Sequence, residues 1–180
     1  MTLRILVFLF DSRSAPEFLL SIKRFIIENQ NYYLQYLKTI ETQIMANSTP
    51  EIIWKILINF EEYELWNPFM INVVGDTKLG SKIKVKIQTV SGKQRTYYPT
   101  ITRLEINKEL RWKGKSFLPG IFDGERIFII EKSTDNKVLF IHKEIFTGLG
   151  VKLVGDKLDE DLRESFEKMN IALKTKAENF

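Results

Sequence analysis

The fold is decided by the stretch MANSTPEIIWKIL, residues 45–57, and by the corner WNPF that follows at residues 66–69. Ser48 or Thr49 can cap a helix here, because a hydroxyl at this position accepts from the unpaired backbone N–H groups of the first turn. Pro50 fits that first turn, where its missing N–H leaves no hydrogen bond unmade. The sequence therefore predicts a short helix directly after a strand.

From Val73 onward the hydrophobic period changes to two, which is typical of half-buried strands in an antiparallel sheet. Turn residues such as Ser91-Gly92 and Pro119-Gly120 separate the alternating segments. Pro99 lies inside one segment and indicates an edge position or a bulge. The predicted strands cover residues 36–46, 82–87, 96–106, 110–117, 124–132 and 138–147.

Helical patterns stand on both sides of most of these strands. A second short helix is expected over residues 60–65, ended by Pro68, and a long helix over residues 149–177. The strand, the two short helices, the run of strands and the long helix together predict an α+β fold, with helices gathered on one side of an antiparallel sheet. The apolar stripe of the long helix consists of Leu158, Leu162, Phe166, Met169 and Leu173.

Composition limits the chemistry. The 180 residues, 44% hydrophobic and 28% charged, suit one globular domain with a short extension. The chain has no Cys and only one His, which excludes disulfides and thiolate nucleophiles and argues against a transition-metal enzyme. We expect no cofactor. The net charge of +4 is spread along the chain, so no nucleic acid partner is expected. The lack of Cys fits a reducing compartment, and we expect a cytoplasmic protein.

Residues 1–35 are expected to form an N-terminal extension, and residues 36–180 the main domain. An apolar run over residues 3–10 is too short to span a bilayer, and a secretion signal would need a basic flank that is missing. Residues 16–29 have helical spacing, so an extra N-terminal helix that packs on the domain is predicted. Membrane association of this helix is the alternative that we do not favour.

Landmarks along residues 38–178 resemble, in their order, the START-like or SRPBCC superfamily, which includes polyketide cyclase-like proteins. The resemblance implies a helix-grip fold, in which a curved antiparallel sheet wraps around a long C-terminal helix and a hydrophobic ligand lies between them. Its members include ligand carriers, hormone receptors and cyclases, so a shared fold does not transfer chemistry. The landmarks are Trp54, residues 66–69, Gly75, Gly80 and residues 97–101, 110–114, 118–124, 142–148 and 169–174.

Strand alternation predicts which side chains face the interior. Arg126, His142 and Glu144 lie on the same strand faces as large aromatic residues. We therefore expect these three side chains to enter an apolar space. Buried charges are costly unless paired, so an ion pair between Arg126 and Glu144 is predicted, with His142 hydrogen-bonded nearby. This trio either anchors the polar end of a hydrophobic ligand or is a self-satisfied structural pair.

Three functions remain open. The first is a small-molecule binding module for a lipid- or polyketide-like ligand, and the alternative is a cyclase or dehydratase that uses general acid/base chemistry. The third is a protein-interaction or membrane-associated factor that docks through residues 1–35. The sequence names neither the ligand nor the oligomeric state. The predicted ligand-binding residues are Trp66, Tyr97, Trp112, Phe122, Arg126, Phe128, Phe140, His142, Glu144, Phe146 and Met169.

Overall fold

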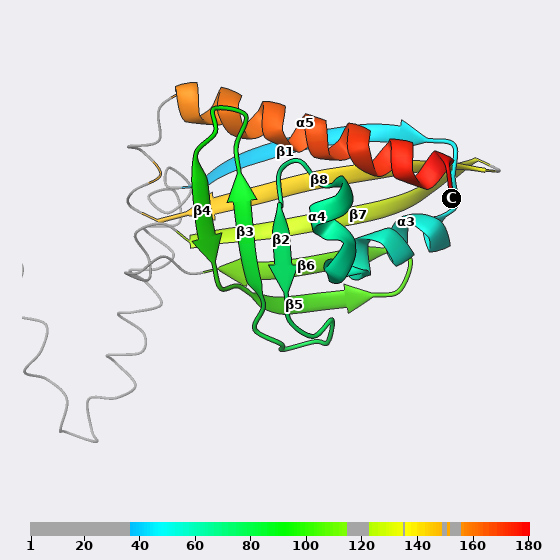
Figure 1. Ribbon diagram of the computed structural model, residues 1–180, viewed down its shortest axis with the longest axis horizontal. Coiled ribbons are helices and arrows are strands. Elements are labelled where there is room, and N and C mark those ends of the chain that lie inside the picture. Colours follow the sequence, from blue (N-terminus) through cyan, green and yellow to red (C-terminus); the bar gives the residue numbers. More distant parts are fainter. Residues whose placement is uncertain (1–36, 115–122, 135, 149–150, 152–155) are drawn as a thin grey trace, which may run out of the picture. The chain divides into compact units, whose positions relative to one another are not determined.

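The computed structural model describes residues 37–114, 123–134, 136–148, 151 and 156–180 (Figure 1). The predicted N-terminal extension and its helix lie outside these residues, and so does Phe122. The domain division between residues 35 and 36 therefore stays a prediction.

A five-stranded antiparallel sheet forms the body of the domain, in the order β1-β8-β7-β6-β5. The predicted alternation is confirmed on β8, where Phe140, His142 and Phe146 are buried on one face. Asn107 and Asn136 adopt positive φ in the tight turns that join neighbouring strands, a conformation that Asn tolerates well. The strands are β1 (Leu37–Ala46), β5 (Thr100–Glu105), β6 (Glu109–Gly114), β7 (Asp123–Thr134) and β8 (Lys137–Thr147).

A smaller sheet, β2-β3-β4, continues from the first. Its strands are β2 (Asn72–Val74), β3 (Lys84–Gln88) and β4 (Gln94–Tyr97). The single strand predicted over residues 96–106 is split into β4 and β5, because Pro99 interrupts the ladder. Backbone bonds from Ile83 N to Pro99 O and from Ile101 N to Ser81 O, both 2.9 Å, carry the pairing across the break.

Both short helical segments that the sequence predicts are present, the first with the predicted cap. Thr49 caps α3 (Pro50–Ile58) in an extended conformation, and its hydroxyl accepts from Ile52 N at 3.5 Å. A 3₁₀ turn over Phe60–Glu62 leads into α4 (Tyr63–Trp66), so the second helix is shorter and more irregular than predicted. In Figure 1 these helices lie near the chain's C-terminus.

The long helix α5 (Asp156–Glu178) runs beside β1 and β8 (Figure 1). Leu162, Phe166, Met169 and Leu173 of its predicted stripe are buried. Polar contacts fix its position, because Asn170 Nδ2 donates to Thr42 Oγ1 of β1 at 2.9 Å. The domain is therefore an α+β, helix-grip fold, as predicted. No helix among the described residues is long and apolar enough to span a bilayer.

Candidate ligand-binding site

The predicted ion pair between β7 and β8 is present. Arg126 and Glu144 are register partners on the two strands, and Arg126 Nη2 donates to Glu144 Oε2. Their side chains are only 7% and 13% exposed. Because an unpaired buried charge is expensive, each group requires the other.

Two aromatic rings cover the guanidinium. Its central carbon lies 4.8 Å from the ring centroid of Phe69 and 4.6 Å from that of Phe166 on α5. The predicted Trp-Asn-Pro-Phe corner is what presents Phe69: Asn67 Oδ1 accepts from Phe69 N at 3.0 Å and from Met70 N at 2.8 Å. Both ring contacts favour the charged guanidinium, because a cation is attracted to the face of a ring.

His142 is completely buried and works as part of the same cluster. Its Nε2 lies 2.9 Å from Arg126 Nη1, and its ring stacks on Phe166 with centroids 4.1 Å apart. Burial, and second the charge of Arg126, hold the pKa of His142 well below its usual value. A neutral ring that accepts at Nε2 carries its proton on Nδ1. Nδ1 and Asn170 Oδ1, both buried without a hydrogen-bond partner in the described part of the chain, are thus a complementary donor and acceptor.

Burial also acts on the ion pair. It raises the pKa of Glu144, whereas the charge of Arg126 and their hydrogen bond oppose the shift. Burial lowers the pKa of Arg126, and Glu144 opposes that change. Burial raises the pKa of the Tyr97 hydroxyl on β4, the charge of Arg95 opposes this shift, and the charge of Glu144 adds to it. Tyr97 therefore lies within electrostatic range of Glu144. Tyr97 is nevertheless 43% exposed, so the cluster is accessible to solvent on the side of Tyr97.

Aromatic rings fill the inner part of the space between the sheet and α5. Phe128 is the centre of this packing, with centroids 4.8 Å from His142, 5.2 Å from Trp112 and 5.9 Å from Phe140. All four of these side chains are buried. Phe128, Phe140 and Trp112 therefore act as core residues in this state of the molecule.

At the end of β6 and β7, the described residues place no side chain on the inner face of the sheet. Gly114 and Gly124 are register partners there, and both are half-buried. A Cβ on Gly124 would lie 2.9 Å from Glu144 Oε1 and 3.9 Å from the Phe146 ring, whereas a Cβ on Gly114 would lie 3.7 Å from Pro99. We call Gly114 and Gly124 the glycine floor. The pairing of these two glycines in register is what reveals the floor, and the sequence alone does not show that pairing.

The other predicted residues lie in different places. Phe146 is buried beside the glycine floor. Met169 is buried on α5. Trp66 packs against Tyr63 with centroids 5.2 Å apart, and its Nε1 is buried without a described hydrogen-bond partner. Trp66 lines a hollow of about 440 Å³ at the end of α5 with Thr175 and Phe180. It is therefore not brought together with the ion pair.

A second hollow, of about 700 Å³, lies between the start of α3 and the turn that joins β5 to β6. Its lining includes Glu51, Ile106 and Lys132. Neither hollow includes Arg126, His142 or Glu144. The site that the sequence predicts and the two surface hollows are thus different features.

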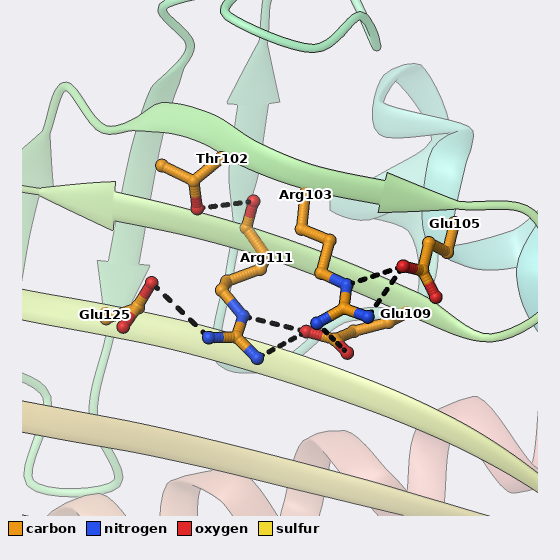
Figure 2. Close-up of polar contacts among 6 residues, drawn as sticks. All are labelled: Thr102, Arg103, Glu105, Glu109, Arg111 and Glu125. Carbon is orange, nitrogen blue, oxygen red and sulfur yellow. Dashed lines mark hydrogen bonds and ion pairs between the residues drawn. The ribbon is translucent and has the colours of Figure 1, made fainter.

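A second polar cluster spans β5, β6 and β7 (Figure 2). Glu109 is its centre, since Oε1 accepts from Arg111 Nε at 2.7 Å and Oε2 lies 3.3 Å from Arg103 Nη1. Glu105 and Glu125 complete the cluster from its two ends. Its charges pair with one another and link three neighbouring strands, so we interpret the cluster as structural and call it the cross-strand brace. Among the described residues, no group of His, Asp and Glu side chains is placed to hold a metal ion.

Comparisons with known proteins agree on the fold. No protein-family model and no curated protein sequence matches the chain. A START superfamily protein from Mycobacterium smegmatis is 17% identical with a TM-score of 0.63, covering 78% of this chain and 97% of that chain. The Zhui aromatase/cyclase from Streptomyces sp. R1128 is 12% identical with a TM-score of 0.64, covering 79% of this chain and 94% of that chain.

A plant protein has the same architecture. Major latex-like protein 151 from Panax ginseng is 9% identical with a TM-score of 0.65, covering 79% of this chain and 98% of that chain. At such low identities the likeness concerns the fold alone. The chain has the START-like, SRPBCC-type fold that its landmarks predicted.

Proposed function

We propose that this START-like domain binds a small hydrophobic molecule, whose polar end lies against the Arg126–Glu144 pair and whose apolar body covers the glycine floor. The observation that carries this proposal is the juxtaposition of the two features. Glu144 Oε1 lies 2.9 Å from where a Cβ of Gly124 would stand. A few convergent polar groups beside an apolar surface are the usual make-up of small-molecule sites.

Packing supports a site at the end of the sheet rather than along its whole length. His142, Phe128 and Phe166 occupy the inner space with ring centroids 4.1 to 4.8 Å apart. Gly114 and Gly124 have no side chains, and both are half-buried. The proposed ligand therefore lies on the glycine floor, with Phe146 beside it and Tyr97 at the solvent-accessible side.

Hydrophobic ligand binding fits the geometry better than cyclase or dehydratase chemistry does. A general base must lie within hydrogen-bond reach of the proton that it removes. His142 is fully buried, and its Nε2 already faces Arg126 at 2.9 Å. Glu144 binds Arg126 through Oε2, and its other oxygen, Oε1, can accept from a ligand. A single carboxylate held by Arg126 is suited to anchoring a ligand. The Zhui structure is named an aromatase/cyclase, and turnover assays would distinguish the two functions.

The test fills the glycine floor. Gly114→Val adds a side chain on the inner face, and its Cβ would lie at ordinary contact distances, 3.7 Å from Pro99 Cβ and 4.0 Å from Gly124 O. Lys113→Val adds the same group to the exposed outer face of the same strand and serves as the matched control. Binding of naphthalene-based probes to the full chain is measured by isothermal titration calorimetry. We expect Gly114→Val to weaken binding at least tenfold and Lys113→Val to leave it unchanged. Equal affinities in both variants would contradict the proposal.

A further inference from the structure

We propose that the ligand of this site is uncharged and binds through a hydroxyl or another neutral donor, which donates a hydrogen bond to Glu144 Oε1. This inference rests on the proposed function and names the class of molecule that the site accepts. It follows from how the hydrogen-bonding groups of the ion pair are already used.

Glu144 has one oxygen engaged and one oxygen open. Oε2 accepts from Arg126 Nη2. Among the described residues no group donates to Oε1, and this atom is not one of the buried polar atoms without a partner. Oε1 instead lies 2.9 Å from where a Cβ of Gly124 would stand, and Gly124 pairs with Phe146, on the other side of Glu144 from His142 along β8. A carboxylate oxygen in an ion pair is an acceptor, so its natural partner is a donor.

Arg126 is poorly placed to bind an anion. Nη1 is directed at His142 Nε2, and Nη2 at Glu144. The rings of Phe69 and Phe166 lie over the guanidinium at 4.8 and 4.6 Å. A ligand carboxylate would therefore meet the open oxygen of Glu144, a like charge, beside a guanidinium that already faces two partners and whose side chain is only 7% exposed.

A cation gains little for the opposite reason. The Arg126–Glu144 pair is neutral as a unit, so the attraction of Glu144 for a ligand ammonium is offset by the repulsion of Arg126. Both kinds of ion would also lose hydration at a site where the side chains of the pair are only 7% and 13% exposed. A neutral hydroxyl makes the hydrogen bond without this loss. Arg95 on β4 is a different case, because it is exposed. An anion bound to Arg95 would stay in contact with water and would not enter the site beside Glu144.

The body of the ligand is defined by the glycine floor. Gly114 and Gly124 present flat backbone, and Phe146 lies at one side. Flat backbone favours a flat ring over a branched chain, because a ring can touch both glycines at once. The site is thus suited to hydroxylated, ring-containing molecules.

A matched probe series tests this class. 2-Naphthalenemethanol, 2-naphthoate and 2-naphthalenemethylamine carry one ring system with a neutral, an anionic and a cationic end at pH 7. We expect the full wild-type chain to bind the alcohol at least tenfold more tightly than either ion. In Glu144→Gln, Arg126 loses its counter-charge, so the naphthoate should gain affinity and the alcohol should lose its advantage. Folding of this variant is checked by its melting temperature.

Gly124→Ala gives a second, independent variant. Its Cβ would stand 2.9 Å from Oε1, so the carboxylate must move, and the preference for the alcohol should shrink while the ion pair remains. Equal or tighter binding of either ion to the wild-type chain would overturn the inference and leave the proposed function standing. Failure of all three probes to bind would overturn the proposed function as well.

Discussion

Arg126 is a buried cation with a partner on each side. It bonds Glu144 and His142 with its terminal nitrogens and lies between the rings of Phe69 and Phe166. Replacing it by Leu keeps apolar contact with the rings but leaves Glu144 buried and unpaired. We expect Arg126→Leu to lower the free energy of unfolding at pH 7 by about 3–5 kcal/mol, measured by urea denaturation.

The double variant Arg126→Leu/Glu144→Leu is the control for this prediction. It removes both charges from the apolar site, and replacing a whole buried pair is often nearly neutral. We therefore expect it to recover most of the lost stability. A double variant as unstable as Arg126→Leu would show that the guanidinium contributes through packing rather than through charge.

His142 makes stability depend on pH. Its pKa is lowered in the folded chain by burial and by Arg126, so the unfolded state binds a proton first as the pH falls. Its contribution is complete above the unfolded value near 6.5 and is lost below it. We expect the free energy of unfolding to drop by about 1.4 kcal/mol between pH 7.5 and 5.5 on account of this residue.

His142→Gln isolates this effect, because the chain contains no other His. Glu144 acts with the opposite sign: burial raises its pKa, so its contribution is lost as the pH rises through the folded pKa. The difference between the wild type and the variant removes the part that Glu144 contributes to both. A difference that does not change between pH 7.5 and 5.5 would contradict a neutral, buried His142.

At this scale the sequence predicted a good part of the cluster. Alternation along two adjacent strands is enough to bring Arg126, His142 and Glu144 to one face, and the cost of buried charge is enough to pair them. The covering rings were not predictable, since Phe69 and Phe166 come from a corner and a helix far apart in the chain. Local periodicity carries no information about which distant ring covers which charge.

Among the elements, the brace across β5, β6 and β7 gives a matched pair of tests (Figure 2). Glu109 is 11% exposed and faces two Arg side chains, whereas Glu105 is 46% exposed and faces one. We expect Glu109→Gln to lower the free energy of unfolding by about 1–2 kcal/mol. Glu105→Gln should have a much smaller effect, because solvent screens an exposed pair.

The measurement is urea denaturation of both variants at low and at high salt. The cost of Glu109→Gln should persist in 0.5 M salt, whereas any cost of Glu105→Gln should vanish, because screening acts on exposed charges. If the two substitutions cost the same, the brace does not depend on burial.

Element boundaries were predictable where a local signal exists. Thr49 and Pro50 mark the start of α3, and the structure places the cap there. Pro99 predicted an irregularity in this strand. The division into β4 and β5 that results depends on pairing with residues 81–83, which the segment itself does not reveal. The extent of a strand is decided by its neighbours, which a single segment does not reveal.

At the scale of the whole molecule, the order of elements predicted an α+β helix-grip fold, and the architecture agrees. The order does not predict how much space remains between the sheet and α5, because that depends on the size and direction of every ring inside. In the part of the chain that the structure describes, the rings fill the inner space and no side chain covers the sheet at Gly114 and Gly124. The location of the proposed site therefore depends on how the side chains of the whole molecule pack.

The most direct test is a map of amide chemical-shift changes when 2-naphthalenemethanol is added to the ¹⁵N-labelled full chain. The account predicts saturable changes centred on Gly114, Gly124 and Glu144, with Tyr97 at their margin. Changes centred instead on the hollow at Trp66 and Phe180, on the hollow beside Ile106, or nowhere in the chain would contradict it.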